Sequence, residues 1–238
     1  MALDKMVDSA QLDSNLKSVA DAIRAKAETE DLLAFPDGFV EAVDSIPVSK
    51  ADAELVEQFR RVCTRGTQTS ITSIPDDITS IGDYTFYRCA NLALTSLPSG
   101  VTSIGSNAFQ SCRSITSISL PSSITKIPYR AFQYCTGLTS ISLPSVVTEI
   151  EQQAFGNCTA LTSISLPSGV KNIDIYAFDT CIKLSSVTFE GTPTFIANNA
   201  FNYCRALETI NVPWAEGAVA NAPWGATNAT INYNYTGE

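Results

Sequence analysis

The chain has 238 residues, of which 45% are apolar and 16% charged, and it carries a net charge of −9 at pH 7. This length and composition indicate a folded protein with one extended core or two modest domains, while the acidic balance argues against nucleic acid or an anionic membrane as a partner. The chain contains no His, which excludes serine triads, Cys–His pairs and ordinary His-bearing metal sites.

Residues 1–66 are predicted to form a small helical domain. Apolar residues recur at helical spacing over residues 12–27, 35–46 and 49–62. Asp37 and Ser49 begin the second and third of these helices as candidate N-caps. We expect the last helix to cover the first structural unit of the region that follows.

A fixed period of 23 residues begins after this segment. Phe recurs at positions 86, 109, 132, 155, 178 and 201, and Cys recurs at positions 89, 112, 135, 158, 181 and 204. A constant period in the twenties is the signature of a solenoid, in which each repeat is one coil stacked on the next. The sequence therefore predicts a solenoid over residues 67–212.

Each coil divides into a turn and a strand. The segment AFQYCTGL places Phe132, Cys135 and Leu138 at a spacing of three, which predicts a short helical turn with one apolar face. The segment LTSISLP then alternates, with Ile141 and Leu143 on one face, as a half-buried strand requires. A second short segment, VVTEI, supplies further inward residues. The predicted fold class is therefore an α+β solenoid.

The first coils depart from this pattern. The segment ALTSLP places Leu94 one residue early and puts Thr95 in the usual apolar position, and SITSIP does the same with Ile71 and Thr72. We expect a bulge or a slip of the strand at this end of the solenoid.

The repeat pattern AFxxCxxLxxIxLPxxVxxI resembles the BspA-type leucine-rich repeat of bacterial surface and phage-associated proteins, over residues 70–213. This resemblance implies a right-handed leucine-rich-repeat stack of short strands and short helical turns. The segments LKSVADAIRAKAETEDLLAFPDGFVEAVDSI and VPWAEGAVANAPWGATNATINYNY also resemble the ends of phage and prophage structural proteins of Gram-positive bacteria.

The repeated Cys residues have two interpretations. Stacked coils lie about 4.8 Å apart, but side chains at equivalent positions point in parallel, whereas a disulfide needs two converging Cβ atoms. Buried free Cys behaves as a small hydrophobic residue, so we predict a packing ladder, with disulfides, metal binding or catalysis as the alternative. Cys63 is off the period and is the one thiol that we expect to be separately reactive.

Carboxylates are the remaining candidates for catalysis. Asp76 with Asp77, or Glu149 with Glu151, could supply an acid and a base for glycoside hydrolysis. The alternative is charge on solvated loops and strand faces, because a solenoid of this size lacks the deep pocket that raises the pKa of one carboxylate. We predict no catalytic residues, no metal and no cofactor.

Residues 213–238 are predicted to form an aromatic C-terminal cap. They contain the two Trp of the chain, Trp214 and Trp224, each preceded by Pro. Both Trp could close the end of the core, or they could form a stacking platform for sugar rings or an anchor for a partner. The segment TINYNY alternates as a final strand would.

The outward positions of the coils show what varies. Two rows on the strand face are nearly constant, Ser117, Ser140, Ser163, Ser186, Thr209 and Ser119, Ser142, Ser165, Thr188, Asn211. We interpret these hydroxyls mainly as bonding along the stack, with a polar ligand face as the alternative. The turns on either side of Ala–Phe do vary, as Gln133 and Tyr134 illustrate.

The variable turns carry the candidate binding residues, because Tyr and Arg are the types that anchor interfaces. These candidates are Tyr84, Arg88, Tyr129, Arg130, Tyr134, Tyr176, Tyr203 and Arg205, with Trp214 and Trp224 added from the cap. The alternative is that they are scattered residues on a solvated surface.

We predict a non-enzymatic binding or attachment module that recognises a protein or a cell-surface glycan. The terminal resemblances favour a phage or prophage tail-associated or host-recognition protein; the alternatives are a bacterial adhesin, an intracellular scaffold and, more distantly, a carboxylate hydrolase. The start of the chain has no apolar segment of a secretory signal, and no run approaches the length of a membrane span. We expect synthesis in the cytoplasm, with a final location there, on a virion or on a cell surface, and no insertion into a membrane.

Overall fold

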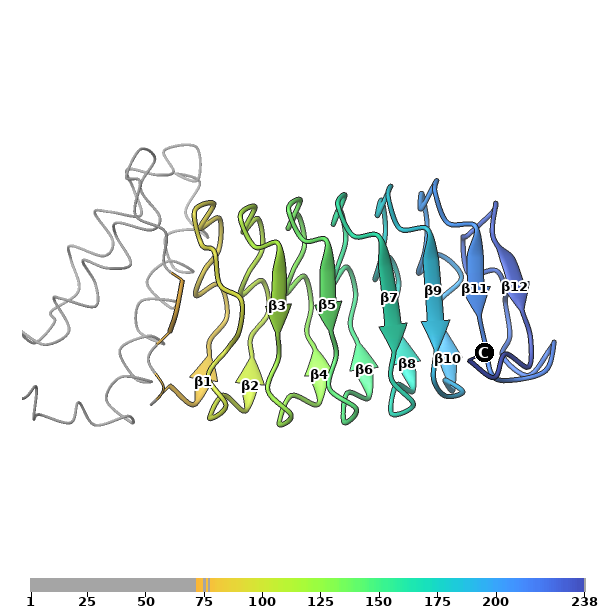
Figure 1. The fold of residues 1–238 in the computed structure, drawn as a ribbon, viewed down its shortest axis with the longest axis horizontal. Helices are drawn as coiled ribbons and strands as arrows, with labels where there is room; N and C mark the ends of the chain where they lie inside the picture. The colour runs from red at the N-terminus through yellow and green to blue at the C-terminus, as the bar shows by residue number, and fades with distance from the viewer. Residues whose placement is uncertain (1–71, 75, 77, 238) are drawn as a thin grey trace, which may run out of the picture.

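The computed structural model describes residues 72–74, 76 and 78–237, and the helices predicted for residues 1–66 lie outside them. The described chain is a β-solenoid of about seven coils of about 23 residues (Figure 1). Its strands are β1 (Ser80–Ile81), β2 (Ser103–Ile104), β3 (Ser117–Ser119), β4 (Lys126–Ile127), β5 (Ser140–Ser142), β6 (Glu149–Ile150), β7 (Ser163–Leu166), β8 (Asn172–Ile173), β9 (Ser186–Phe189), β10 (Phe195–Ile196), β11 (Thr209–Asn211) and β12 (Thr230–Asn232).

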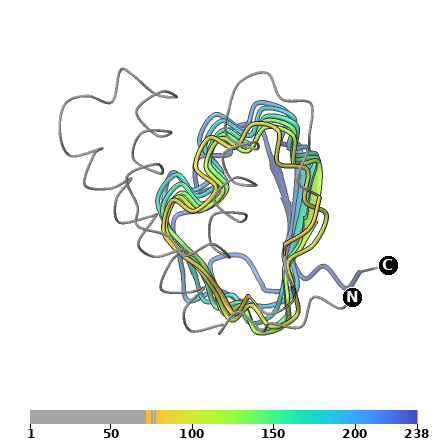
Figure 2. The ribbon, with the colours of Figure 1, turned by 90° about the vertical axis from the view of Figure 1, so that its left-hand side faces the viewer.

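The strands form two walls of parallel sheet. One wall contains β3–β5 and β7–β9–β11–β12, and the other contains β1–β2 and β4–β6–β8–β10. The register follows the sequence period, since Ser117 pairs with Ser140 and Ser163 with Ser186. Seen along the stack, the coils overlie one another closely (Figure 2), so equivalent residues of successive coils form straight rows.

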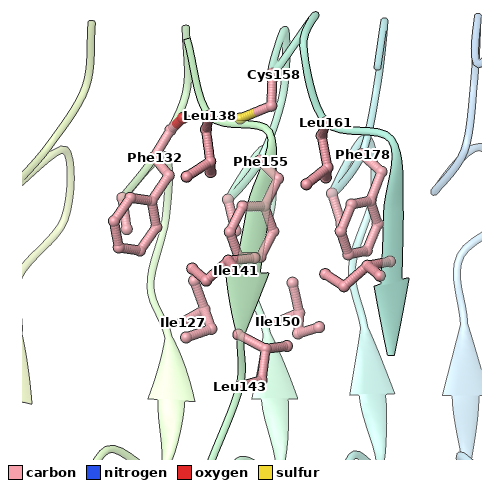
Figure 3. Close-up of a cluster of buried hydrophobic side chains, with 14 of the residues drawn as sticks. Ile127, Phe132, Leu138, Ile141, Leu143, Ile150, Phe155, Cys158, Leu161 and Phe178 are labelled. Atoms are coloured by element: carbon pink, nitrogen blue, oxygen red, sulfur yellow. Dashed lines mark hydrogen bonds between the residues drawn. The ribbon is translucent and has the colours of Figure 1, made fainter. Parts of the chain in front are cut away.

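The core consists of these rows of inward side chains. The six repeated Phe residues are at most 2% exposed, and successive rings stack with centroids 5.2 to 5.6 Å apart and planes within 17° of parallel (Figure 3). Ile141 and Ile150 are buried beneath the rings, one from each wall. The strand predicted for the segment LTSISLP is therefore confirmed as β5, and the second segment, VVTEI, which is expected only to supply inward residues, contains the short strand β6.

The predicted helical turn is wrong, because the segment around each Phe is a series of turns and the described residues contain no helix. In the first coil, Tyr84, Phe86 and Arg88 donate their N–H groups to carbonyls of the next coil, at 2.7 to 2.9 Å. The alternate residues Thr85, Tyr87 and Cys89 instead donate within the coil, to the carbonyls three residues before them, at 2.9 to 3.4 Å. A helix would keep all of these bonds within one segment. We call the inter-coil series the turn ladder.

The strand of the first coil is irregular, as expected, but it shows no slip of register. Leu94 is 1% exposed while Thr95 is exposed, the reverse of the equivalent positions in the next coil. The strand is reduced to a single bridge between Ser96 and Ser119, which keeps the 23-residue register. Ile71 of the preceding coil lies outside the described residues. Among the residues that the structure describes, no helix is long and apolar enough to cross a membrane.

Candidate functional site

The turns are built on backbone with positive φ at two fixed positions, both of which have this conformation in five coils and one of which has it in the sixth. The residue two before Phe has this conformation at Tyr84, Asn107, Arg130, Gln153 and Tyr176, and the residue two after Phe has it at Arg88, Ser111, Tyr134, Asn157, Thr180 and Tyr203, with φ between 53° and 63°. Gly and Asn adopt this region most readily, whereas bulky side chains are strained in it. The turn ladder holds the strained conformation in place at nine of these eleven positions, all except Tyr176 and Tyr203, because their N–H groups donate its hydrogen bonds.

Six of the candidate binding residues stand at these strained positions, and the structure divides them into two rows. The row before Phe is engaged within the protein. Arg130 lies over the ring of Tyr129 at 4.7 Å and donates from Nε to Gln153 Oε1 at 2.7 Å. Tyr84 meets the ring of Tyr87 edge-on with centroids 5.8 Å apart. Tyr176 is partly buried.

The row after Phe points its largest side chains to solvent. Tyr134 is 43% exposed and Tyr203 is 61% exposed. Arg88 is exposed, with its guanidinium 5.2 Å from the ring centroid of Tyr87. Arg205, two residues after Tyr203, is also exposed. The predicted set therefore contains a solvated subset, and we call the segments that carry it the turn strip. The turn strip consists of residues 88–91, 111–114, 134–137, 157–160, 180–183 and 203–206.

The turn strip also contains residues that the sequence prediction missed. Arg113, Ile182 and Lys183 are exposed there, at the positions four or five after Phe. An alignment of the coils by position, instead of a search for Tyr and Arg beside Ala–Phe, would have found them. Conversely, Gln133 varies between coils but is only 3% exposed, because its Oε1 accepts a hydrogen bond from Gln110 Nε2 at 2.7 Å inside the turns.

Both Trp residues lie in the core at the C-terminal end. Trp224 is fully buried and Trp214 is 6% exposed, and the two rings pack against Phe189 and against each other with centroids 5.1 to 6.4 Å apart. The indole of Trp224 donates to the carbonyl of Ala220 at 2.8 Å. This burial favours the end-closing role over a surface platform for sugar rings.

The hydroxyl rows are arranged differently from the expectation. The bonds along the stack come mainly from a neighbouring Thr row, in which Thr139 Oγ1 donates to the carbonyl of Thr116 at 2.9 Å and Ser185 Oγ donates to that of Thr162 at 3.1 Å. The two predicted Ser rows lie on the outward face of β3, β5 and β7, where their residues are exposed. Direct side-chain bonds along them occur at the C-terminal end, from Asn211 to Thr188 at 3.3 Å.

The six repeated Cys residues form a buried ladder of free thiols. Each thiol from Cys112 onward donates from Sγ to the carbonyl of the Phe in the preceding coil, at 3.0 to 3.2 Å. Burial raises the pKa of Cys135 to about 12, and burial is also the largest cause of the raised pKa values of Cys158 and Cys181. The packing interpretation is confirmed for these six residues, while Cys63 lies outside the described residues.

The acidic residue Glu151 has a structural role. Its Oε1 pairs with Lys126 Nζ at 2.7 Å, and its Oε2 accepts the N–H of Tyr129 at 2.8 Å. The hydrogen bond to Glu151 is the main cause of the raised pKa of Lys126. Both oxygens of this carboxylate therefore hold neighbouring coils together. Asp77 of the other candidate pair lies outside the described residues.

Comparisons with known proteins place the fold in a bacterial context. A leucine-rich repeat protein from Bacteroides ovatus is 31% identical, with a TM-score of 0.53 over 60% of this chain and 39% of that protein. A leucine-rich repeat protein from T. pallidum is 33% identical, with a TM-score of 0.52 over 60% of this chain and 67% of that protein. A third, from Eubacterium ventriosum, is 31% identical, with a TM-score of 0.51 over 55% of this chain and 35% of that protein.

No match arises among curated protein sequences, and the comparisons do not support the resemblance of the terminal segments to phage proteins. The family model described as "BspA type Leucine rich repeat region (6 copies)" matches residues 58–162 and 125–216. These two matches together cover well over half of the chain and include every coil that carries the Phe and Cys rows. The chain belongs to the BspA-type leucine-rich repeat family.

Proposed function

We propose that the chain is a non-enzymatic attachment module that recognises a protein or a cell-surface glycan through its turn strip. The observation that carries this proposal is the exposure of Tyr134 and Tyr203 at positive φ. Neither side chain fills the core, and the backbone there favours Asn, which Asn157 supplies in the same row. A large aromatic residue kept at a strained and exposed position points to a role outside the fold.

The architecture supports the same function. Leucine-rich repeats generally act as non-catalytic binding modules, and stacked coils present an extended surface for binding. Five of the six segments of the turn strip are held rigidly, because the first residue of each, such as Tyr134 or Asn157, donates its N–H group to the next coil at 2.7 to 2.8 Å. A preorganised surface loses little conformational entropy on binding.

Three biological settings fit an attachment module: a bacterial adhesin, a virion or prophage tail protein, and an intracellular scaffold. The family match favours a bacterial protein. The virion setting rests only on the resemblance of the terminal segments.

The test is binding of the fluorescently labelled full chain to a panel of bacterial cells that includes Gram-positive species. We expect saturable binding to some of these cells. Protease treatment of the cells and removal of their wall polysaccharide then distinguish protein from glycan receptors. The double variant Tyr134→Ser/Tyr203→Ser should lose at least tenfold in affinity, since exposed aromatic anchors each contribute about 1–2 kcal/mol to binding.

A matched control uses Phe195, which is 50% exposed on β10. This strand belongs to the wall of β4, β6, β8 and β10, whereas the turn strip leads into the strands of the other wall. Phe195→Ser should bind cells as the unmodified chain does. Absence of binding to every cell type would count against the attachment function, and equal losses in Phe195→Ser and the Tyr variant would show that the turn strip is not the contact surface.

A further inference from the structure

The turn strip carries positively charged residues and no acidic ones, although the chain as a whole is acidic. Arg88, Arg113, Lys183 and Arg205 all lie in it, and not one of the 24 acidic residues of the chain does. All four cations are exposed. Within the described residues, the one ion pair joins Lys126 to Glu151, outside the turn strip. The strip is therefore a basic band on a chain with a net charge of −9.

The cations and the exposed tyrosines fall into two similar groups. Arg88, Arg113 and Tyr134 occupy three successive coils at the N-terminal end of the turn strip, and Lys183, Tyr203 and Arg205 occupy two successive coils at its C-terminal end. Each group has two cations and one exposed Tyr. The two Tyr residues are three coils apart, or about 14 Å at the spacing of parallel strands.

The surroundings favour a sugar polymer over a peptide. A peptide bound in extended form adds its main-chain hydrogen bonds to a free sheet edge, but the N–H groups of Tyr134 and Asn157 are already used in the turn ladder. The chain runs from the turn strip directly into the face of exposed Ser residues on β3, β5 and β7. Hydroxyls and aromatic rings with a polar tip suit a ligand that has apolar ring faces and many hydroxyl groups.

We infer that the turn strip binds an anionic polysaccharide that lies along the solenoid axis, with its acidic groups at the two cation pairs and sugar rings on Tyr134 and Tyr203. This inference rests on the proposed attachment function and specifies its ligand class. The acidic groups are carboxylates of uronic acids or phosphates of a wall polymer, both of which Arg recognises through its planar guanidinium. Two groups on one rigid rod gain affinity from simultaneous binding to one polymer chain.

The experiment measures the affinity of the full chain for two anionic polymers, polygalacturonate and a glycerol-phosphate teichoic acid, with dextran as a neutral polymer and polyglutamate as an acidic polypeptide. We expect binding to at least one anionic polymer that weakens as salt rises from 50 to 300 mM, because screening acts on exposed charges. The two anionic arms distinguish carboxylate from phosphate recognition. Dextran and polyglutamate should bind at least tenfold more weakly.

Two variants locate the site. Arg113→Gln/Arg205→Gln should weaken binding to the anionic polymer by about 25-fold, at about fivefold for each cation near an anionic surface. Tyr134→Asn/Tyr203→Asn should weaken binding about tenfold or more without changing its salt dependence. The control Lys171→Gln removes an exposed cation beside β8 on the other wall and should change affinity less than twofold.

Each outcome bears on a different conclusion. If polyglutamate binds as tightly as the anionic polysaccharides, or if Lys171→Gln loses as much affinity as the double Arg variant, the attraction is unspecific and the inference is overturned. Binding to cells without binding to either anionic polymer overturns the ligand class but leaves the attachment function in place. No binding to cells or polymers overturns both.

Discussion

The ring stack makes a strong prediction for Phe155→Ala. Replacing a fully buried Phe by Ala costs about 3–5 kcal/mol, and the cost rises when the surroundings cannot close the cavity. Phe155 stacks between Phe132 at 5.6 Å and Phe178 at 5.3 Å, which adds about 0.5–1.5 kcal/mol for each ring contact. The neighbouring rings cannot approach each other, because the N–H of Phe132 is bonded to the carbonyl of Ala154 at 2.9 Å and fixes the coil spacing. We therefore expect a loss of about 5 kcal/mol in the free energy of unfolding.

Urea unfolding followed by two probes measures this loss. Tryptophan fluorescence reports the C-terminal end, because both Trp residues of the chain, Trp214 and Trp224, are buried there. Far-UV circular dichroism reports the whole chain. In Phe155→Ala the two transitions should separate, since weakening one interface of a solenoid uncouples the coils on either side.

Phe195→Ala is the matched control, because its ring is 50% exposed and its removal should cost less than about 1 kcal/mol. A loss below about 2 kcal/mol in Phe155→Ala, or equal losses in the two variants, would refute the account of a closely packed ring stack with fixed spacing.

Four further results are expected. At pH 8 the native thiol of Cys135 should react with a disulfide reagent only after unfolding, because a pKa of about 12 leaves about one thiolate in ten thousand; rapid native reaction would contradict its burial. This pKa lies above the value of 9.0 for an exposed thiol, so the native state keeps its proton at pH values where the unfolded state loses it. The free energy of unfolding, measured from pH 7 to 11, should therefore be constant up to about pH 9 and fall above it. The fall should be less steep in Cys135→Ala. Gly169→Ala should lose about 1–3 kcal/mol in chemical denaturation, because its Cβ would lie 2.5 Å from the carbonyl oxygen of Ser145. Gly100→Ala, with 3.5 Å to its nearest neighbour, should lose less than about 0.5 kcal/mol. Tyr203→Asn should raise the melting temperature or leave it unchanged, because Asn relieves strain at a φ of 55°; a marked drop would mean that the Tyr ring supports the fold.

The rows of the core could be predicted because six coils repeat the same inward residues. Ile141 and Leu143 alternate with Ser in a way that fixes the buried face of β5. The turn could not be predicted in the same way, because the spacing of three between Phe132 and Cys135 occurs in a helix and also in this turn. The hydrogen bonds that decide between them run to the next coil, from Phe132 to Ala154 and from Tyr134 to Gly156, and no local pattern reveals them.

The candidate site was predictable only in part. Tyr134, Tyr203 and Arg205 are exposed as the variation between coils indicates. Arg130 varies as much, but it packs on Tyr129 within the turns. Variation thus identifies positions that the repeat does not determine, but it does not reveal whether the side chain bonds to the next coil or reaches solvent. The large side chains two residues before the Phe pack within the protein and those two residues after it reach solvent, whereas Gln133, directly after the Phe, is buried.

The turn ladder also affects how the number of coils can change. The N–H groups of Phe109 and Phe155 point toward the following coil, and the carbonyls that accept them point back. Each coil therefore offers its successor the same set of donors. A duplicated 23-residue unit would therefore dock without any new chemistry. The series ends where the N–H of Phe201 meets the carbonyl of Trp224 at 3.0 Å, supplied by a loop outside the repeat. Gain or loss of whole coils can thus change the reach of the molecule while this terminal loop stays the same.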